Sequence, residues 1–251
     1  WFSLVVSFQE HTSVLLRKKW PPMLMSLDER CNFFKSTGID GCVLLEFNSE
    51  LAQLTAENFL TRLTTIGMKA LIVGHDFTFG TGASGNTDFI LNYVNKHALY
   101  GEIIPPVKYQ GETVCSSQIR SLLLAGNLSQ ANGMLNRPFR LTGKVEEGDH
   151  RGRTLGFPTA NLSCPAHHLL PKYGVYLVQV FLEGKEYYGL ANVGRKPTFN
   201  QNTPLAEVHI FDFSTEIYGQ VLVVDFLSFL REERKFSSAD ELMDQMLKDK
   251  K

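Results

Sequence analysis

The chain has 251 residues, of which 43% are hydrophobic and 20% are charged. This length and composition are enough for two ordinary domains with hydrophobic cores. The net charge of -1 provides no broad basic surface, which disfavours duplex nucleic acid as a partner. No apolar run is long enough to span a membrane and no signal peptide precedes the first predicted strand, so we expect a soluble protein.

The cysteines are scattered along the chain without any Cys-x-x-Cys pair. This distribution argues against a zinc site and against a disulfide framework, and it favours a reducing cytoplasm. The first residue, Trp1, is not a methionine. We therefore expect a natural segment upstream of the printed sequence.

The first half of the chain alternates between strand-like and helix-like segments. Apolar runs of strand length are typical of parallel strands that are buried on both faces. Ser26 and Glu29 form a predicted capping box, and Thr55 is a second predicted helix cap. The predicted strands cover 3–8, 41–47, 70–73 and 103–104. The predicted helices cover 26–34, 55–63 and 88–96, and two further helices are predicted to start at 116 and at 129. This pattern predicts an open, doubly wound α/β sheet with a ligand site at the carboxyl ends of its strands.

Two segments of this half have the residues of a ligand site. The loop over 74–85 follows the third predicted strand, and Phe77 and Phe79 in it could hold a flat ring between them. Its alternative is a surface loop whose phenylalanines pack back on the sheet. Near the start of a later helix, the serines and the arginine of 115–120 could meet phosphates. The alternative there is an ordinary serine cap with a solvated arginine.

Around residue 137 the sequence changes from helical periodicity to strand alternation, and we place a domain boundary between 136 and 137, giving domains 1–136 and 137–251. The predicted strands cover 139–145, 174–181, 186–193, 205–211 and 221–229. They predict a small closed antiparallel β-barrel. A final amphipathic helix is expected from Ser237 or Ser238, with Leu242, Met246 and Leu247 on its core face.

The densest group of glycine, cationic and small polar residues lies at 148–162. Glycines let a backbone approach a ligand closely, and successive backbone N–H groups can form an anion-binding nest. After Pro158 the chain should enter a strand with Thr159 and Asn161 on one side, where their oxygens suit a divalent cation and phosphates. The segment is not a Walker A loop. Its alternative is a glycine and proline turn that leads into a strand.

The string over 152–162, Gly-Arg-Thr-Leu-Gly-Phe-Pro-Thr-Ala-Asn-Leu, resembles the signature of riboflavin kinases. In that family the Pro-Thr-Ala-Asn segment holds magnesium ATP. The similarity continues through 173–176, 192–199 and 207–211. The resemblance implies an ATP and phosphate site with Mg²⁺ on Thr159, formed by Gly152, Arg153, Gly156, Thr159 and Asn161.

The resemblance also implies a catalytic carboxylate. In phosphoryl transfer the protein positions groups and stabilises charge, and a carboxylate can take the proton of the acceptor hydroxyl. Glu207, in Glu-Val-His-Ile, matches the family's catalytic glutamate, although strand alternation alone favours a solvent-facing position. His209 shares its face and is interpreted as a core histidine. Arg231 is a candidate flavin contact or part of a solvated charge run. The pair at 167–168 lacks a third metal ligand and is discounted.

The first half resembles the bacterial FMN adenylyltransferase domain, which precedes the kinase domain in bifunctional proteins. Gly-x-Asp-Phe-x-Phe-Gly is similar to its flavin-side loop, and 115–120 is similar to its Ser-Ser-Thr-x-x-Arg segment. The implied flavin residues are Gly74, Asp76, Phe77 and Phe79, and the implied phosphate residues are Ser116, Ser117 and Arg120. The segment 7–12 keeps the family's histidine but lacks both of its prolines. The family's His-x-Gly-His loop does not occur and would lie upstream.

These resemblances predict an enzyme that phosphorylates riboflavin to FMN with magnesium ATP and, in the complete protein, adenylylates FMN to FAD. We expect these 251 residues to form FMN but little FAD. The alternatives are a non-catalytic flavin-binding or flavin-sensing protein and a kinase with an inactive adenylyltransferase domain. A nucleic-acid-binding first domain is a weaker alternative because the charge is near neutral.

Overall fold

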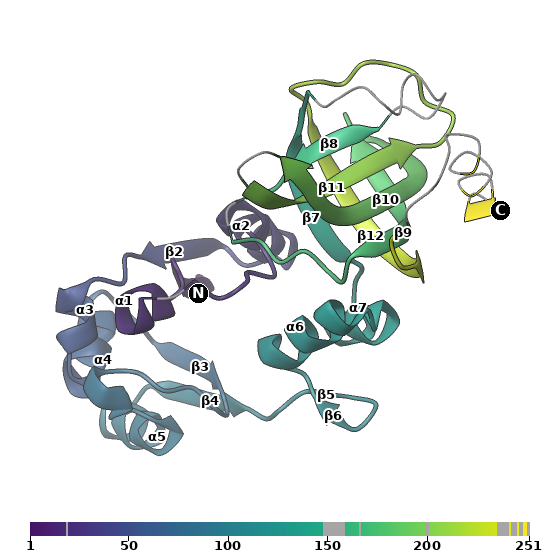
Figure 1. Cartoon of the computed structure of the whole chain (residues 1–251). Coiled ribbons are helices and arrows are strands. Elements are labelled where there is room, and N and C mark those ends of the chain that lie inside the picture. Colours follow the sequence, from purple (N-terminus) through teal and green to yellow (C-terminus); the bar gives the residue numbers. More distant parts are fainter. Residues whose placement is uncertain are drawn as a thin grey trace. The chain divides into compact units, whose positions relative to one another are not determined.

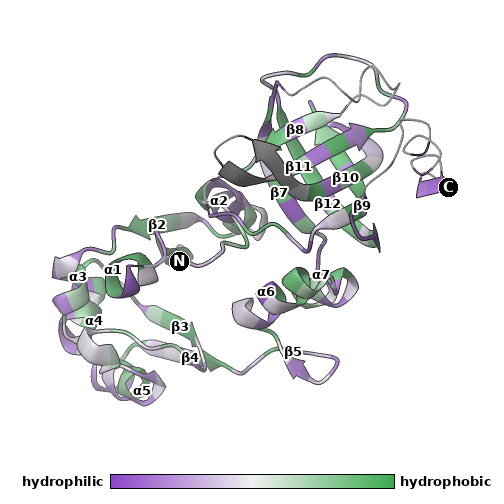
Figure 2. Ribbon diagram, viewed as in Figure 1, coloured by the Kyte–Doolittle hydropathy of each residue, from purple (hydrophilic) through white to green (hydrophobic). Residues whose placement is uncertain are grey.

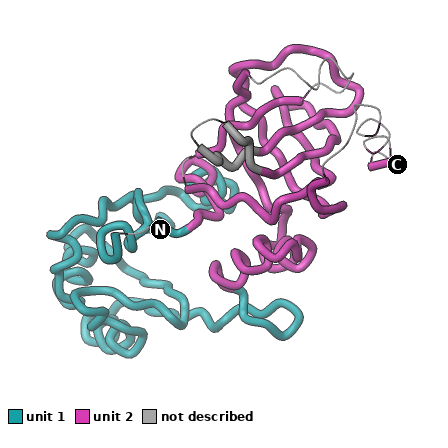
Figure 3. Tube along the Cα trace, in the orientation of Figure 1, with its two compact units in different colours: residues 1–21, 31–114 teal, residues 22–30, 115–251 magenta. Residues whose placement is uncertain are grey.

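The structure is a computed structural model that describes residues 1–18, 20–147, 159–165, 167–198 and 201–234, together with 241, 245, 248 and 249. Within β-strands, the side chains of 195–198 and 201–205 are not described. The chain forms two compact units (Figure 3). Unit 1 comprises 1–21 and 31–114, and unit 2 comprises 22–30 and 115–251. The predicted boundary between 136 and 137 stays a prediction.

Unit 1 contains two pairs of parallel strands (Figure 1). Strands β1 (Leu4–Phe8) and β2 (Gly41–Leu45) form one pair, and β3 (Ala70–Gly74) and β4 (Tyr100–Ile104) form the other. Parallel neighbours need a long crossover connection, usually a helix. Helices α2 (Leu27–Ser36) and α5 (Thr87–Lys96) provide these crossovers in the chain. The alternating strands and helices expected for a doubly wound domain are therefore present.

The helices begin where short polar side chains can accept backbone hydrogen bonds. The Thr55 hydroxyl accepts from the Asn58 N–H at 3.2 Å, and Ser26 and Glu29 form the predicted reciprocal capping box at 3.1 and 2.7 Å. The helices are α1 (Ser13–Arg17), α2 (Leu27–Ser36), α3 (Ser49–Gln53), α4 (Ala56–Thr65) and α5 (Thr87–Lys96), with a 3₁₀ turn, η1 (Thr81–Ala83). A small hairpin, β5 (Lys108–Tyr109) and β6 (Glu112–Thr113), follows.

The hydrophobic core of unit 1 lies between its helices and β3 and β4. Leu60 of α4 and Ile90 and Val94 of α5 are almost fully buried, and partly buried apolar side chains of β3 and β4 pack on them. The strands themselves are less protected, since the side chains of Leu4 and Ile72 are each 57% exposed. Isolated two-stranded sheets have little stability of their own. The helix layer therefore supplies most of the apolar burial in this unit.

Unit 2 is built around a closed six-stranded barrel with the strand order β10-β11-β8-β7-β12-β9. Five of the strands were expected from alternation, and β8 is the strand expected after Pro158. The strands are β7 (Phe139–Glu146), β8 (Ala160–Ser163), β9 (Gly174–Leu182), β10 (Lys185–Thr198), β11 (Gln201–Ile210) and β12 (Val221–Arg231). The predicted antiparallel barrel is confirmed.

The barrel core follows the strand period of two, and green apolar positions alternate with paler or purple ones along the strands in Figure 2. Leu141 and Val145 of β7 are buried, whereas Lys144 and Glu146 are exposed. Tyr176 packs edge-on against Phe226 inside the barrel, with ring centroids 5.1 Å apart. This alternation tells us which side chains point outward on every paired strand.

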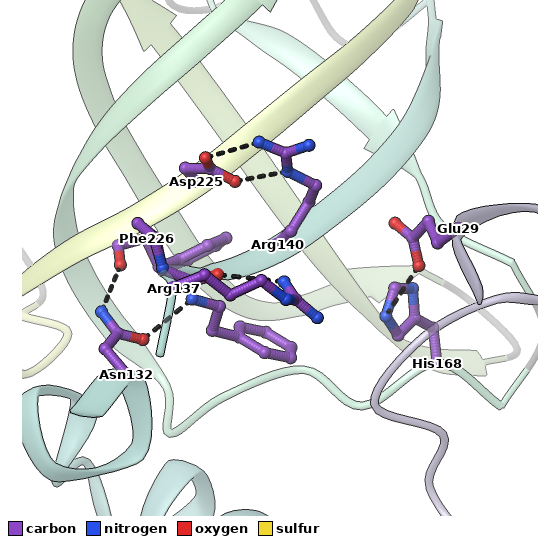
Figure 4. Close-up of polar contacts among 9 residues, drawn as sticks. Glu29, Asn132, Arg137, Arg140, His168, Asp225 and Phe226 are labelled. Atoms are coloured by element: carbon purple, nitrogen blue, oxygen red, sulfur yellow. Dashed lines mark hydrogen bonds and ion pairs between the residues drawn. The ribbon is translucent and has the colours of Figure 1, made fainter. Parts of the chain in front are cut away.

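Helices α6 (Ser116–Ala125) and α7 (Leu128–Leu135) belong to unit 2. Asn132 of α7 binds the barrel through both ends of its amide (Figure 4). Its Nδ2 donates to the Phe226 carbonyl at 2.9 Å, and its Oδ1 accepts from the Phe139 N–H at 2.8 Å. One side chain thus fixes α7 to the first and last barrel strands.

An ion pair lies on the outer face of the same strands (Figure 4). Arg140 donates to both carboxylate oxygens of the buried Asp225, at 2.6 and 2.7 Å. The hydrogen bonds to Asp225 raise the pKa of Arg140. Two-point contact fixes the guanidinium plane, and the Arg140 side chain also lies over the Phe181 ring at 5.3 Å. The pair cross-links β7 and β12.

In the sequence, the segment 22–30 lies between two stretches of unit 1, but in the structure it belongs to unit 2. Met23 makes backbone hydrogen bonds to His167 and Leu169, each at 2.7 Å. Glu29 lies 3.7 Å from the buried His168 ring (Figure 4). Burial lowers the pKa of His168, and the nearby Glu29 carboxylate opposes that shift. These contacts attach the segment to the chain that follows β8.

Cys164, next to β8, is expected to react with iodoacetamide about tenfold or more slowly than the exposed Cys115 at roughly pH 8. Burial, helped by the negative charge of Glu29, raises the pKa of Cys164 to about 12. Because the thiolate is the reactive form, little of this side chain can react. Brief alkylation followed by peptide mass spectrometry measures the two rates. Equal labelling in the folded protein would contradict the raised pKa and the half-buried position of Cys164.

Candidate active site

The site is built on the outer face of the barrel, where β8, β11 and β10 lie side by side (Figure 1). Leu162 of β8 is in register with Val145, which points into the barrel. Because side chains alternate along a strand, the neighbouring Asn161 points outward. The role of this amide toward ATP, which the resemblance to riboflavin kinases implies, stays a prediction.

Strand register brings the expected catalytic carboxylate next to this amide. Glu207 of β11 pairs directly with Asn161 on one side and with Asn192 of β10 on the other. Directly opposed residues of antiparallel strands project to the same face, with Cβ atoms about 4.5–5.5 Å apart. The row continues from Asn192 to Val175 of β9 and then to Arg231 of β12. We call these five residues the outer row.

The surroundings of the outer row are partly apolar. Asn161 is only 8% exposed, and Leu190, an outward neighbour on β10, is 4% exposed. Glu207 is half-buried rather than fully solvent-facing. Low local dielectric strengthens electrostatic contacts to a bound ligand. His209, two residues beyond Glu207 on the same outer face, is buried although it does not point into the barrel core.

The residues at Asn161 fit a magnesium ion that accompanies ATP. Among the described residues, no hydrogen-bond partner reaches the buried Oδ1 of Asn161. Such an unsatisfied oxygen is costly unless a ligand uses it, and an amide oxygen is a ligand type that Mg²⁺ accepts. Thr159, half-buried, immediately precedes β8 and provides a hydroxyl. Gly152, Arg153 and Gly156, the other expected ATP residues, lie outside the described residues.

The opposite end of the outer row is occupied by an ion pair. Arg231 donates to Asp249 through Nε at 2.9 Å and through Nη2 at 2.7 Å. Gln245 donates to the other oxygen of Asp249 at 2.8 Å. The interpretation of Arg231 as a flavin contact stays a prediction, and the structure adds Asp249 as the group that orients its guanidinium. The predicted start of the final helix, at 237 or 238, and its core residues lie outside the described residues.

The Gly-Val-Tyr motif has a packing explanation. A Cβ on Gly174 would lie 2.4 Å from the Arg231 carbonyl oxygen, and Gly174 has φ +152°, so only glycine allows β9 and β12 to approach here. Tyr176 points into the barrel and donates its hydroxyl to the Lys172 carbonyl. Burial raises the pKa of Tyr176, which keeps the phenol protonated. The motif therefore holds β9 against the end of the outer row.

The expected flavin loop of unit 1 differs in one respect from the sequence interpretation. The rings of Phe77 and Phe79 stack on each other, with centroids 5.4 Å apart, so no ring fits between them. Phe79 also packs against Phe59 and Phe89 at 5.6 and 6.2 Å. Phe77 is 37% exposed and offers its outer face to a flat ligand. Gly74 and Asp76, the other residues assigned to this loop, are exposed.

The residues expected to bind phosphate in the first domain lie at the start of α6, in unit 2. Ser116 and Ser117 occupy its first turn, where backbone N–H groups favour anions. Arg120 donates to the Pro22 carbonyl at 2.7 Å, and burial lowers the pKa of its guanidinium. Arg120 therefore has a protein partner within its own unit. Its role toward phosphate stays a prediction.

Among the described residues, no group of three histidine, cysteine or acidic side chains could hold a metal ion. His168 faces Glu29, as described above, and the adjacent His167 adopts φ +64° in a turn. Within the described part of the chain, every helix is too short or too polar to cross a lipid bilayer.

The fold and the site together define a two-part protein: an α/β unit with parallel strand pairs, and a β-barrel that has an amide and a carboxylate side by side on its outer face. Comparison with known proteins gives the particular family. The riboflavin kinase family model matches 135–251 and the FAD synthetase family model matches 1–118. The chain belongs to the family of bifunctional riboflavin kinase/FMN adenylyltransferases.

The similar curated proteins with this name come from several bacteria. The protein of Bacillus subtilis is 33% identical, with 98% of this chain and 79% of that protein covered. The protein of Escherichia coli K12 is 36% identical, with 92% and 74% covered. A crystal structure described as a macrolide-efflux protein from Streptococcus pneumoniae is 33% identical, with a TM-score of 0.90, and covers 98% of this chain and 81% of that one. Its description differs from the two family matches, which agree with the motifs in both halves of the chain.

Proposed function

We propose that the protein transfers the γ-phosphoryl group of magnesium ATP to the terminal ribityl hydroxyl of riboflavin, and that its first part adenylylates the resulting FMN to FAD. Membership of the bifunctional family supports both activities. The observation that carries the kinase proposal is the direct pairing of Glu207 with Asn161 on the outer face of the barrel.

The order of residues along the outer row fits this reaction. Asn161 and Thr159 hold the magnesium-bound phosphates at one end, and Glu207 lies beside them to accept the proton of the attacking hydroxyl. When bound, Mg²⁺ neutralises charge on the transferred phosphate. From Asn161 to Arg231 the row crosses four strand spacings, about 19 Å measured around the curved outer surface of the closed barrel. In this proposal the flavin lies on the side of Glu207 that is away from Asn161.

The remaining parts of the proposal concern the first unit and the setting. Phe77 offers an exposed ring face to a flavin, and Ser116 and Ser117 offer a helix N-terminus to phosphate. Riboflavin, FMN, ATP and FAD are the substrates and products. A cytoplasmic location is supported by four cysteines that are all free.

Incubation of the protein with riboflavin, ATP and Mg²⁺ is expected to produce FMN, because the barrel contains the phosphate-binding and proton-accepting groups. Liquid chromatography with fluorescence detection separates riboflavin, FMN and FAD in one run. Omission of Mg²⁺ by chelation should abolish the product. Folded protein that converts no riboflavin, with a working member of the family as a positive control, would reject the kinase proposal.

A further inference from the structure

The segment 22–30 links the two units through the path of the chain. It lies in the connection between β1 and β2, yet it belongs to unit 2. The chain therefore passes from one unit to the other at three places, 21–22, 30–31 and 114–115. The first two passages exist only because this segment packs in unit 2. If the segment detached, a single covalent connection would remain.

Backbone hydrogen bonds attach the segment at Met23. The Met23 N–H donates to the His167 carbonyl, and the Met23 carbonyl accepts from the Leu169 N–H, each at 2.7 Å. The two bonds form an isolated parallel β-bridge. Arg120 adds a bond to the Pro22 carbonyl at 2.7 Å. So short a pairing has little stability of its own, and the attachment therefore also depends on side chains.

The His168 ring is the buried centre of this attachment. Its side chain is 1% exposed, and it packs edge-on against Phe139 with ring centroids 6.3 Å apart. Its Nε2 lies 3.4 Å from the Leu24 carbonyl oxygen and 3.7 Å from Oε2 of Glu29 (Figure 4). Both neighbours are hydrogen-bond acceptors, so we assign the proton of the neutral ring to Nε2.

A second proton on this ring would have no acceptor. Among the described residues, no hydrogen-bond partner reaches the buried Nδ1 of His168. Protonation would therefore bury an unsatisfied N–H donor together with a charge, and both are costly. In agreement with this geometry, burial lowers the pKa of His168, although the Glu29 carboxylate and the Leu24 carbonyl oppose the shift.

The charges around His168 are already balanced. The ionised groups that interact there are Glu29, Asp225, Arg137 and Arg140 (Figure 4). Cys164 also lies near Glu29, and its pKa of about 12 keeps the thiol neutral. Two carboxylates and two guanidinium groups sum to zero. A protonated His168 would therefore leave this partly buried group with an uncompensated positive charge.

We propose that the segment 22–30 is an acid-released clasp, which neutral His168 holds on unit 2 and which protonation of His168 detaches. The proposal does not depend on the riboflavin kinase activity. In the detached form the ring is solvated and has its ordinary pKa of about 6.5, whereas the pKa in the closed form is lower. The neutral ring therefore stabilises the closed clasp above about pH 6.5, and this stabilisation is lost as the pH falls toward the pKa of the closed form.

Hydrogen exchange, measured by mass spectrometry on the full chain, tests the clasp. The N–H groups of Met23 and Leu169 are bonded in the bridge, so peptides that contain them report its opening. After correction for the intrinsic rate at each pH, their exchange is expected to rise about fivefold to tenfold from roughly pH 7.5 to roughly pH 5.5. Peptides from β9 should show no comparable rise, because the opening is local.

Three variants identify the titrating group. His168→Gln keeps a side-chain donor but cannot take a proton in this range, so the exchange at Met23 should lose its pH dependence whatever its level. His97→Gln is the matched control, because His97 is exposed in unit 1, where it stacks on Tyr93 at 4.2 Å. This control should keep the full pH dependence. Glu29→Gln preserves the capping box and should keep it as well.

The unmodified protein alone can overturn the proposal. Exchange at Met23 and Leu169 that does not change with pH would do so, and so would an equal rise in the peptides of β9, which would indicate global unfolding. A pH dependence that survives in His168→Gln and disappears in Glu29→Gln would assign the titration to the carboxylate and reject the role of His168. A local rise that His168→Gln abolishes and His97→Gln retains supports the clasp.

Discussion

Replacing Glu207 with glutamine is expected to lower kcat for riboflavin phosphorylation by on the order of a hundredfold or more, the usual contribution of a positioned general base. Glutamine keeps the shape of the side chain and removes its ability to take a proton. The strand that carries Glu207 is paired on both sides, with β8 and β10, so the barrel and both substrate affinities should be preserved. Steady-state kinetics with riboflavin and ATP, together with circular dichroism, measure the effect.

Glu186→Gln is the matched control for this substitution. Glu186 is on the same strand as Asn192 but six residues earlier, roughly 20 Å along β10, where it accepts a hydrogen bond from Gln179 at 3.0 Å. It should retain normal turnover. A rise in KM alone in Glu207→Gln would assign Glu207 to substrate binding, and nearly normal turnover in a folded variant would show that another group accepts the proton.

Much of the fold follows from local sequence signals. The apolar runs of unit 1 and the alternating segments of unit 2 are strands in the structure. The spacing of apolar residues can be read from a short stretch of sequence, and tertiary packing then stabilises the strand that this spacing predicts. Capping residues located helix starts closely: Thr55 and the Ser26–Glu29 box make the expected hydrogen bonds. Short helices such as α1 and α3 were missed, since five residues contain too little periodicity to distinguish a helix from a loop.

The pairing between elements could not be obtained in the same way. Alternation places Glu207 on a strand, but only the register of β11 against β8 and β10 shows that it lies between Asn161 and Asn192. Asp249 likewise has no sequence signal that connects it to Arg231, which is 18 residues earlier. Contacts of this kind depend on barrel closure, which a single sequence does not specify locally.

The segment 22–30 illustrates a second limit. A change of periodicity near residue 137 indicates where helices give way to strands, yet compactness depends on which surfaces pack together. Asn132 joins α7 to the barrel, and Met23 joins an early segment to the chain after β8. Such long-range contacts group residues that the linear pattern separates. The structural units and the sequence-based boundary therefore describe different properties of the chain.

Replacement of Asn161 or Thr159 with alanine is expected to weaken binding of magnesium ATP by about tenfold or more, the loss typical of a hydrogen bond to a charged group, while riboflavin affinity changes little. The Asn161 Oδ1 is buried with no hydrogen-bond partner among the described residues. Because an unsatisfied buried oxygen is costly, we expect a bound ligand to satisfy it. Calorimetric titration with a non-hydrolysable ATP analogue plus Mg²⁺, and separately with riboflavin, measures both affinities.

Ser163→Ala provides the comparison for these variants. Ser163 is two residues beyond Asn161 on β8, points to the same outer face and pairs with Lys144 rather than with the carboxylate strand. Loss of its hydroxyl should leave ATP affinity unchanged, because it lies outside the outer row. Asn161→Ala and Thr159→Ala proteins that bind ATP normally and lose only riboflavin would reverse the assignment, placing the flavin at β8 and the nucleotide toward Arg231. Equal weakening of ATP by Ser163→Ala would instead indicate a general disturbance of β8.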